Sequence, residues 1–212
     1  MFLFAFDREN THSSGAGHVQ WRVVAHSVPA AILGEFTSAR TPQMPPSVIF
    51  WMCDAAKQLG AERIIAMSRY ADRQALAREF GATDIIEARG DDGVALVKDL
   101  TDGLGAHSVV EAVGTQESMM QAIRSTRPGG HVGFVGVSHD VQLPGIELFF
   151  STVHLHGGPA PVRRFLPELI QLIWDREINP GAVFDLTLPL ADAAEGYRAM
   201  DQRRAIKVLL QP

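Results

Sequence analysis

The sequence predicts an α/β fold in which helices cover both faces of a parallel, doubly wound sheet. From about residue 54 onward, short apolar segments typical of buried strands alternate with helical segments of about ten residues. Glycine, proline and small polar residues separate these segments. The length of 212 residues suits one such domain with an extension, and 46% hydrophobic against 20% charged residues is ordinary for a folded chain.

The expected strands are spaced regularly along this region. They cover residues 64–67, 83–87, 108–113, 131–137, 152–156, 184–188 and 206–210. A turn over residues 127–130, which read Arg-Pro-Gly-Gly, should precede the fourth of them.

Helix signals fill the intervals between these strands. Gly81 ends a helix over residues 70–80, and Thr115 can cap a helix that runs through Ser125. Another expected helix has Asp91 or Asp92 as its N-cap. Two more cover residues 162–176 and 192–200.

Residues 1–53 form a poorly defined segment, so we place the nucleotide-binding domain at residues 54–212. The periodicity of this segment is weak, and prolines and the run Gly15-Ala16-Gly17 interrupt it. A short strand over residues 21–25 is its main regular feature.

The junction between the two parts has two interpretations. Residues 47–59 fit one apolar helix, with Ser47 as N-cap and Gly60 after its end. Alternatively, residues 48–52 form a strand, which like residues 21–25 could fill the central place of the sheet. Neither interpretation supplies a glycine-rich loop.

The ends of the expected strands carry the candidate cofactor residues, because ligands of such sheets bind outside the carboxyl ends of the strands. Ser68 and Arg69 follow strand 64–67, and Arg73 lies one helical turn later. An arginine here suits the 2′-phosphate of NADP(H), whereas NAD sites place an acidic residue there. The alternative is that Arg69 is a solvated loop residue.

Two further strand ends carry glycine. Val113 and Gly114 end one strand, and Gly136 and Val137 end the next along the chain. Small residues at both places would let a planar ring approach the backbone, although each glycine alone could simply make a sharp turn.

Five motifs in order resemble the cofactor-binding domain of the zinc-dependent alcohol dehydrogenases, in the medium-chain dehydrogenase/reductase family. They are AAKQLGAERII, REFGATDII, DGLGAHSVVEAVGT, STRPGGHVGFVGV and AIKVLLQP, and the likeness covers about residues 54–212. The resemblance implies an oxidoreductase that transfers a hydride between a small alcohol or carbonyl compound and NADP or NAD.

The resemblance also implies roles for particular residues. It places Ser68 and Arg69 at the adenosine ribose, Val113 and Gly114 by the adenine, and Gly136 and Val137 near the nicotinamide. Lys207 falls where the family has a basic residue that reaches the pyrophosphate.

The sequence departs from the family at the catalytic zinc. Such a site needs three protein ligands and an open position. The family's Gly-His-Glu motif has only Gly17-His18-Val19 as its nearest counterpart, and Cys53 is the single cysteine. His154 and His156 share a strand face and could pair on a metal, but they lack a third ligand. We therefore predict no catalytic or metal residues in this chain.

The second departure is that the family's glycine-rich loop, whose backbone N–H groups would hold the pyrophosphate, is missing before AAKQLGA. Each backbone donor to a phosphate contributes about 1.5–3 kcal/mol, so losing two or three donors costs roughly 3–9 kcal/mol. The sequence thus predicts a truncated or frameshifted form with weak cofactor binding and little activity. A non-catalytic module that binds nucleotide or associates with other subunits is the alternative.

Composition limits partners and location. The net charge of −5 offers no basic stripe for nucleic acid, and no apolar run approaches the roughly 18 residues of a membrane span. A single cysteine and no signal segment make a cytoplasmic location the expectation. The family resemblance implies that the strand near Thr152–His156 lies at a sheet edge, which could pair two subunits into a homo-oligomer.

Overall fold

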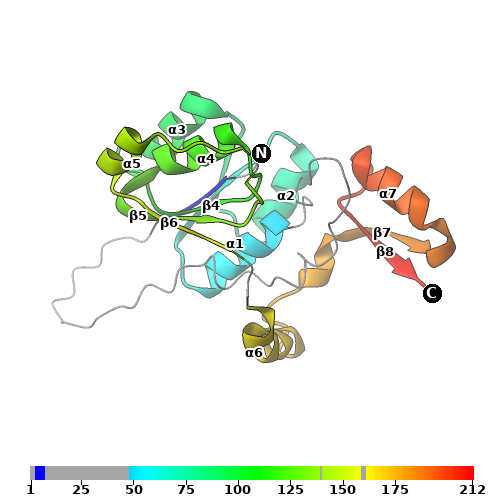
Figure 1. Ribbon diagram of the computed structural model, residues 1–212. Coiled ribbons are helices and arrows are strands. Elements are labelled where there is room, and N and C mark those ends of the chain that lie inside the picture. The colour runs from blue at the N-terminus through cyan, green and yellow to red at the C-terminus, as the bar shows by residue number, and fades with distance from the viewer. Residues whose placement is uncertain (1–2, 8–47, 139, 159–160) are drawn as a thin grey trace.

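The computed structural model describes residues 3–7, 48–138, 140–158 and 161–212, and their main feature is a mixed sheet with helices on both faces (Figure 1). Its strands are β1 (Leu3–Asp7), β2 (Arg63–Met67), β3 (Asp84–Ile86), β4 (Ala106–Glu111), β5 (Thr126–Phe134) and β6 (His154–Gly157). Among the described residues the strand order is β3-β2-β1-β4-β5-β6. This order is that of the doubly wound nucleotide-binding sheet, which confirms the predicted fold class.

β1 occupies the centre of the sheet and runs against its neighbours. It pairs antiparallel with β2 and with β4, so that Ala5 lies opposite both Ile65 and Val109. The other pairs, β2 with β3, β4 with β5 and β5 with β6, are all parallel. β1 thus satisfies the backbone groups of two strands that would otherwise face an empty position.

This arrangement corrects the expectation for the central strand. Residues 48–52 do not form a strand, because they belong to helix α1 (Val48–Gln58), which confirms the helical interpretation. Residues 21–25 lie outside the described part of the chain, as does Ser47. The segment that completes the sheet is instead the five residues Leu3–Asp7.

Seven helices accompany the strands in the described residues. They are α1, α2 (Ala71–Glu79), α3 (Gly90–Asp99), α4 (Gln116–Ser125), α5 (Gly145–Ser151), α6 (Val162–Trp174) and α7 (Ala193–Asp201). Gly81, with a φ of 107°, ends α2 as predicted, and Thr115 forms a reciprocal capping box with Ser118 at the start of α4. Arg89, not an aspartate, occupies the cap position of α3, and Asp91 and Asp92 lie inside its first turn.

Alternating side chains of the strands build two cores, one on each face. On β2, Ile64 and Ala66 belong to a core with Phe50 of α1 and Phe80 after α2. Their neighbours Ile65 and Met67 belong to the other core, which α3 and α4 cover. This two-residue period is the reason why a strand buried on both faces reads as a continuous apolar run.

The C-terminal part forms a second, smaller sheet. β7 (Phe184–Pro189) and β8 (Lys207–Gln211) pair in parallel and are joined by α7, with short 3₁₀ helices at Pro180–Val183 and Leu190–Asp192. Val183 and Ile206 are buried in the core with α1, and the indole N–H of Trp51 donates to the carbonyl of Pro180. The small sheet is therefore anchored to the α1 face.

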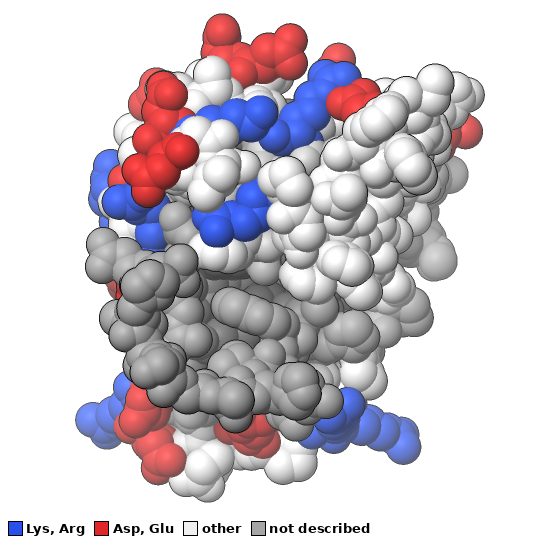
Figure 2. All heavy atoms as spheres, turned by 90° about the vertical axis from the view of Figure 1, so that its left-hand side faces the viewer, with Lys and Arg blue, Asp and Glu red and all other residues white. Residues whose placement is uncertain are grey.

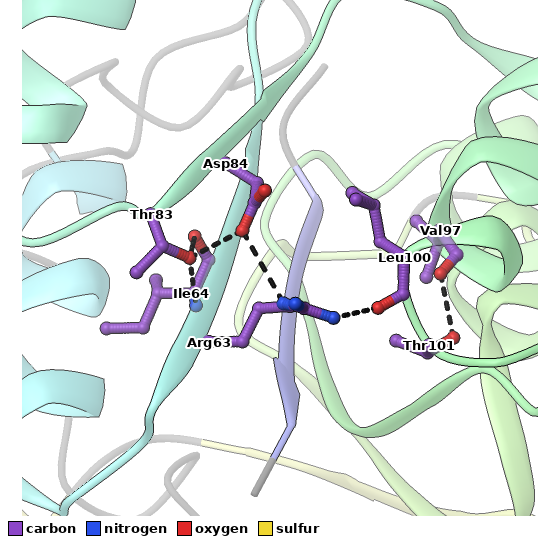
Figure 3. Close-up of polar contacts among 7 residues, drawn as sticks. All are labelled: Arg63, Ile64, Thr83, Asp84, Val97, Leu100 and Thr101. Carbon is purple, nitrogen blue, oxygen red and sulfur yellow. Dashed lines mark hydrogen bonds and ion pairs between the residues drawn. The ribbon is translucent and has the colours of Figure 1, made fainter. Parts of the chain in front are cut away.

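Arg63 links three elements at the start of β2 (Figure 3). Its guanidinium donates to the carbonyl of Leu100 after α3, and its Nε lies 3.8 Å from the carboxylate of Asp84. Thr83 Oγ1 accepts from the N–H of Ile64 at 2.9 Å and donates to Asp84 at 2.6 Å. Because the ion pair is half-exposed, its contribution is about 0–1 kcal/mol, and it orients the strand ends more than it stabilises them.

Two features differ in detail from the predicted elements. Residues 127–130 lie within β5 and are not a separate turn, and the register between β4 and β5 shifts at this place. Helix α5 lies between the expected strands 131–137 and 152–156, where no helix was among those expected. β6 ends the sheet where the sequence places an edge strand, and pairing between copies through it stays a prediction.

No helix among the described residues combines the length and the apolar character that crossing a membrane requires. On the face shown in Figure 2, basic and acidic side chains are interspersed, so this face does not present a uniformly basic surface of the kind that attracts nucleic acid.

The central position of β1 predicts a stability effect at Ala5. In Ala5→Pro the ring removes a ladder N–H and leaves a partner carbonyl unsatisfied, which should lower the free energy of unfolding by about 1–3 kcal/mol. Urea unfolding followed by circular dichroism measures the change. Ala5→Ser, which keeps the amide, is the control, and equal midpoints for the proline variant and the unmodified chain would contradict the pairing.

The buried Cys53 predicts low thiol reactivity. Cys53 is fully buried in α1, and burial, followed by the charge of Asp54, raises the pKa of its thiol well above the usual range. The native chain should therefore react with a disulfide reagent only at the rate at which α1 opens. The same reaction in denaturant, which exposes the single thiol, gives the reference; a rapid native reaction would show that α1 is not packed as described.

Candidate functional site

Most of the predicted cofactor residues gather at one edge of the large sheet. β2, β3, β4, β5 and β6 point the same way, so their carboxyl ends share this edge, called here the carboxyl edge. The predicted residues directly after these ends are Ser68, Arg69, Val113, Gly114, Gly136 and Val137. Arg73 lies in the first turn of α2, and Lys207 begins β8 in the small sheet. Their cofactor contacts stay predictions.

Ser68 shapes the turn that follows β2. It is buried, its N–H donates to the carbonyl of Ile86 at 3.1 Å, and its hydroxyl accepts from the N–H of Tyr70 at 3.4 Å. Its carbonyl accepts from the side-chain amide of Gln74 at 2.9 Å. These bonds hold the backbone from which Arg69 projects.

Arg69 meets a second arginine from the neighbouring strand end. Arg69 and Arg89 both donate to the carbonyl of Glu87, each at 3.3 Å, and Arg89 also donates to Ala88 at 2.9 Å. Burial, followed by the nearby charge of Arg69, lowers the pKa of Arg89 to about 10. Arg89 is still charged at pH 7, and an anion at this place would relieve the repulsion between the two guanidinium groups.

Arg89 was not singled out from the sequence. The signal was present, since Arg89 closely follows the expected strand 83–87 and therefore lies at the carboxyl edge. What the sequence did not give was its proximity to Arg69, which depends on the pairing of β2 with β3.

Arg73 packs on an aromatic ring. Its Cζ lies 5.0 Å from the ring centroid of Tyr70, and Arg203 from the C-terminal part lies at the same distance. Arg203 also donates to the Tyr70 hydroxyl. Burial lowers the pKa of Arg73. Tyr70, the N-cap residue of α2, thus joins this helix to the C-terminal part through its cation–π contact with Arg203.

The loops after β4 and β5 approach each other so closely at Gly114 and Gly136 that neither position has room for a side chain. A Cβ on Gly114, whose φ is 84°, would lie 2.3 Å from the carbonyl oxygen of Val137. A Cβ on Gly136 would lie 2.6 Å from the backbone nitrogen of Gly114. The loops after β4 and β5 therefore pack backbone against backbone, which explains both glycines as structural residues and also leaves bare main chain at the carboxyl edge.

Glu111 holds these two loops together and was missed by the sequence analysis. Its side chain is fully buried, and its Oε1 accepts from the N–H groups of Val113 at 2.7 Å and Gly114 at 2.9 Å. Its backbone carbonyl accepts from Val135 at 2.9 Å and Gly136 at 3.4 Å. A carboxylate that ends a buried strand just before a glycine was the available signal, because such a group needs donors nearby.

The start of β1 lies at the carboxyl edge. Because β1 is antiparallel, its first residue Leu3 pairs with Glu111 at the carboxyl edge. No glycine-rich loop joins a strand to α1 within the described residues, and Gly15-Ala16-Gly17 lies outside them. Lys207 donates its N–H to Asp185 at 3.2 Å, a bond within the small sheet.

The family's catalytic zinc does not fit the residues that the structure describes. Across these residues, no three side chains of histidine, cysteine, aspartate or glutamate are placed to hold a metal ion as they stand. Cys53 is buried in the core, and Gly17-His18-Val19 falls outside the described ranges.

Comparisons with known proteins agree with the geometry. The zinc-binding dehydrogenase family model matches residues 50–174. A probable zinc-binding alcohol dehydrogenase of Mycobacterium tuberculosis is 39% identical over 141 residues, which cover 65% of this chain and 35% of that protein. An NADP-dependent isopropanol dehydrogenase of Entamoeba histolytica is 35% identical over 118 residues, which cover 53% of this chain and 32% of that protein.

A solved structure is similar in fold. The alcohol dehydrogenase TADH from Thermus sp. ATN1 matches with a TM-score of 0.76 and 27% identity, over 90% of this chain and 56% of that one. The aligned parts of the two sequence relatives named above are only about a third of their length.

The family model spans more than half of the 212 residues and includes the strand ends that form the carboxyl edge. The chain belongs to the zinc-binding dehydrogenase family, whose relatives include zinc-type alcohol dehydrogenases.

Proposed function

We propose that this chain is the nucleotide-binding part of an alcohol dehydrogenase and that it prefers NADP(H) to NAD(H). The observation that carries the proposal is the pair Arg69 and Arg89, held together at the carboxyl ends of β2 and β3. NADP differs from NAD by a 2′-phosphate, and two adjacent guanidinium groups suit that group. The printed name of the Entamoeba relative, an NADP-dependent enzyme, supports the same choice.

The other parts of the carboxyl edge have complementary roles in this proposal. The loops after β4 and β5 offer bare main chain at Gly114 and Gly136, against which flat rings could lie. Glu111 keeps the two loops in register. When bound, NADP(H) supplies or accepts the hydride that is exchanged with a small alcohol or carbonyl compound.

Residues 1–212 alone should bind nucleotide weakly and turn over little alcohol. The start of β1 occupies the place of a phosphate loop, and the donors lost there are each worth about 1.5–3 kcal/mol. The described residues also hold no ligand set for a catalytic zinc. The truncated or frameshifted origin suggested by the sequence belongs to this proposal, and resequencing the locus upstream of Ala55 tests it.

The arginine pair predicts how the two nucleotides differ. Arg69→Ala and Arg89→Ala should each weaken NADPH binding by roughly 10–150-fold, since one charge-assisted hydrogen bond is worth about 1.5–3 kcal/mol. NADH affinity should change far less because NADH has no 2′-phosphate. Fluorescence titration of the purified chain with both nucleotides measures this.

A matched control comes from the other end of α2. Arg78→Ala removes the same charge from an exposed residue in the last turn, away from the carboxyl edge, and should leave both affinities unchanged. Equal affinity of the unmodified chain for NADPH and NADH would contradict the preference.

The packed loops predict a difference between two glycine substitutions. Gly103 has a φ of 80° and open space where a Cβ would lie. Gly103→Ala should therefore lower the free energy of unfolding by only about 1–2 kcal/mol, which is the cost of placing alanine in the left-handed conformation. Gly114→Ala pays the same cost and also collides with Val137. It should be clearly less stable in urea unfolding and bind NADPH more weakly. Equal effects of the two substitutions would show that the loops do not pack as described.

A further inference from the structure

Three histidines meet on one face of the sheet edge. His131 on β5 pairs directly with His154 on β6, and His156 lies two residues further along the same strand. Side chains that are paired across strands or two apart along a strand share a face. Their neighbours Val132 and Leu155 point to the opposite face, into the core under α3 and α4.

The spacing of these side chains fits one metal ion. His131 Nδ1 and His156 Nε2 are 3.5 Å apart. Two imidazole nitrogens on a tetrahedral zinc ion, with Zn–N bonds of about 2.0–2.1 Å, would be about 3.3 Å apart. Two ligand atoms are therefore already near the separation that a shared metal requires.

His154 completes the set from the other side. Its ring centroid lies 4.8 Å from that of His131 and 6.4 Å from that of His156, with the rings stacked at 21° and 25°. The rings stack and do not converge, so the three side chains as they stand are not placed to hold a metal ion. His154 is exposed, so its imidazole can turn about χ1 and χ2 to face the same point.

The chemistry of the cluster selects the kind of ion. The form of imidazole that binds metal is neutral, and burial together with the neighbouring His154 and His156 lowers the pKa of His131. A set made of imidazoles suits zinc, nickel or copper ions, whereas calcium and magnesium require oxygen ligands.

We propose that His131, His154 and His156 form a binding site for a divalent transition metal, with zinc as the probe, at the edge formed by β5 and β6. This site is separate from the catalytic zinc site of alcohol dehydrogenases and uses none of the residues at the carboxyl edge. Bound metal cross-links the last strand of the sheet to its neighbour and stabilises the native state, because it does not meet these three ligands together in the unfolded chain.

Isothermal titration of the tag-free chain with zinc chloride tests the site. We expect one ion per chain at micromolar affinity and a rise in melting temperature that grows with zinc concentration. Changes to residues that merely support metal ligands cost about 10–100-fold in affinity, so His131→Asn and His156→Asn should each cost at least about that much. His154→Asn should weaken binding by a smaller factor, since the other two ligands are already close together.

His107→Gln is the matched control. His107 lies on β4 outside the cluster, so this variant should bind zinc like the unmodified chain. Circular dichroism spectra without metal show whether each variant is folded; if His131→Asn is not, His156→Asn at the exposed edge strand gives the answer. Unchanged affinity in the folded cluster variants, or no zinc uptake by the unmodified chain, overturns the proposal. NADPH binding is measured separately and does not enter this test.

Discussion

The pairing of β1 between β2 and β4 is the interaction on which the rest of the structure depends. β2 and β4 lie on either side of one strand position, and their backbone groups need partners because this part of the sheet is buried on both faces. Five residues at the start of the chain supply those partners. Both cores, and the alignment of strand ends that makes the carboxyl edge, require this place to be filled.

The direction of β1 has a cost for ligand binding. A strand that ran parallel to its neighbours would end at the carboxyl edge and could lead through a loop into α1. The antiparallel strand begins there instead, opposite Glu111. The sheet is complete as a structure. In our proposal, the start of this strand occupies the position at which main-chain donors would hold a diphosphate.

The rest of the carboxyl edge is built by local contacts that do not depend on this direction. Glu111 binds the loop after β4 through its side chain and the loop after β5 through its carbonyl. Arg69 and Arg89 converge on the carbonyl of Glu87. These contacts lie at the end of the site that we propose for the adenosine of the nucleotide, whereas the proposed phosphate end meets the start of β1. This contrast is the basis for proposing weak binding.

Features that depend on neighbours along the chain could be predicted from the sequence. The apolar runs of β2 and β4, the stop at Gly81 and the cap at Thr115 follow from side-chain periodicity and backbone preferences within a few residues. The positions of Ser68, Arg69, Gly114 and Gly136 at strand ends followed from the same pattern. The cap of α3 did not, because two adjacent aspartates and the true cap Arg89 compete within three residues.

Which distant segments meet depends on how the whole chain packs in three dimensions. A five-residue segment such as Leu3–Asp7 gains little from its own preferences, and its place in the sheet comes from the unpaired edges of β2 and β4. Strand pairing likewise brought Arg89 to Arg69, and it brought His131 to the two histidines that lacked a third partner. The physical reason is that these contacts depend on the order and register of strands, which are set by burial and backbone hydrogen bonds across the whole sheet and leave no mark within any short stretch of sequence.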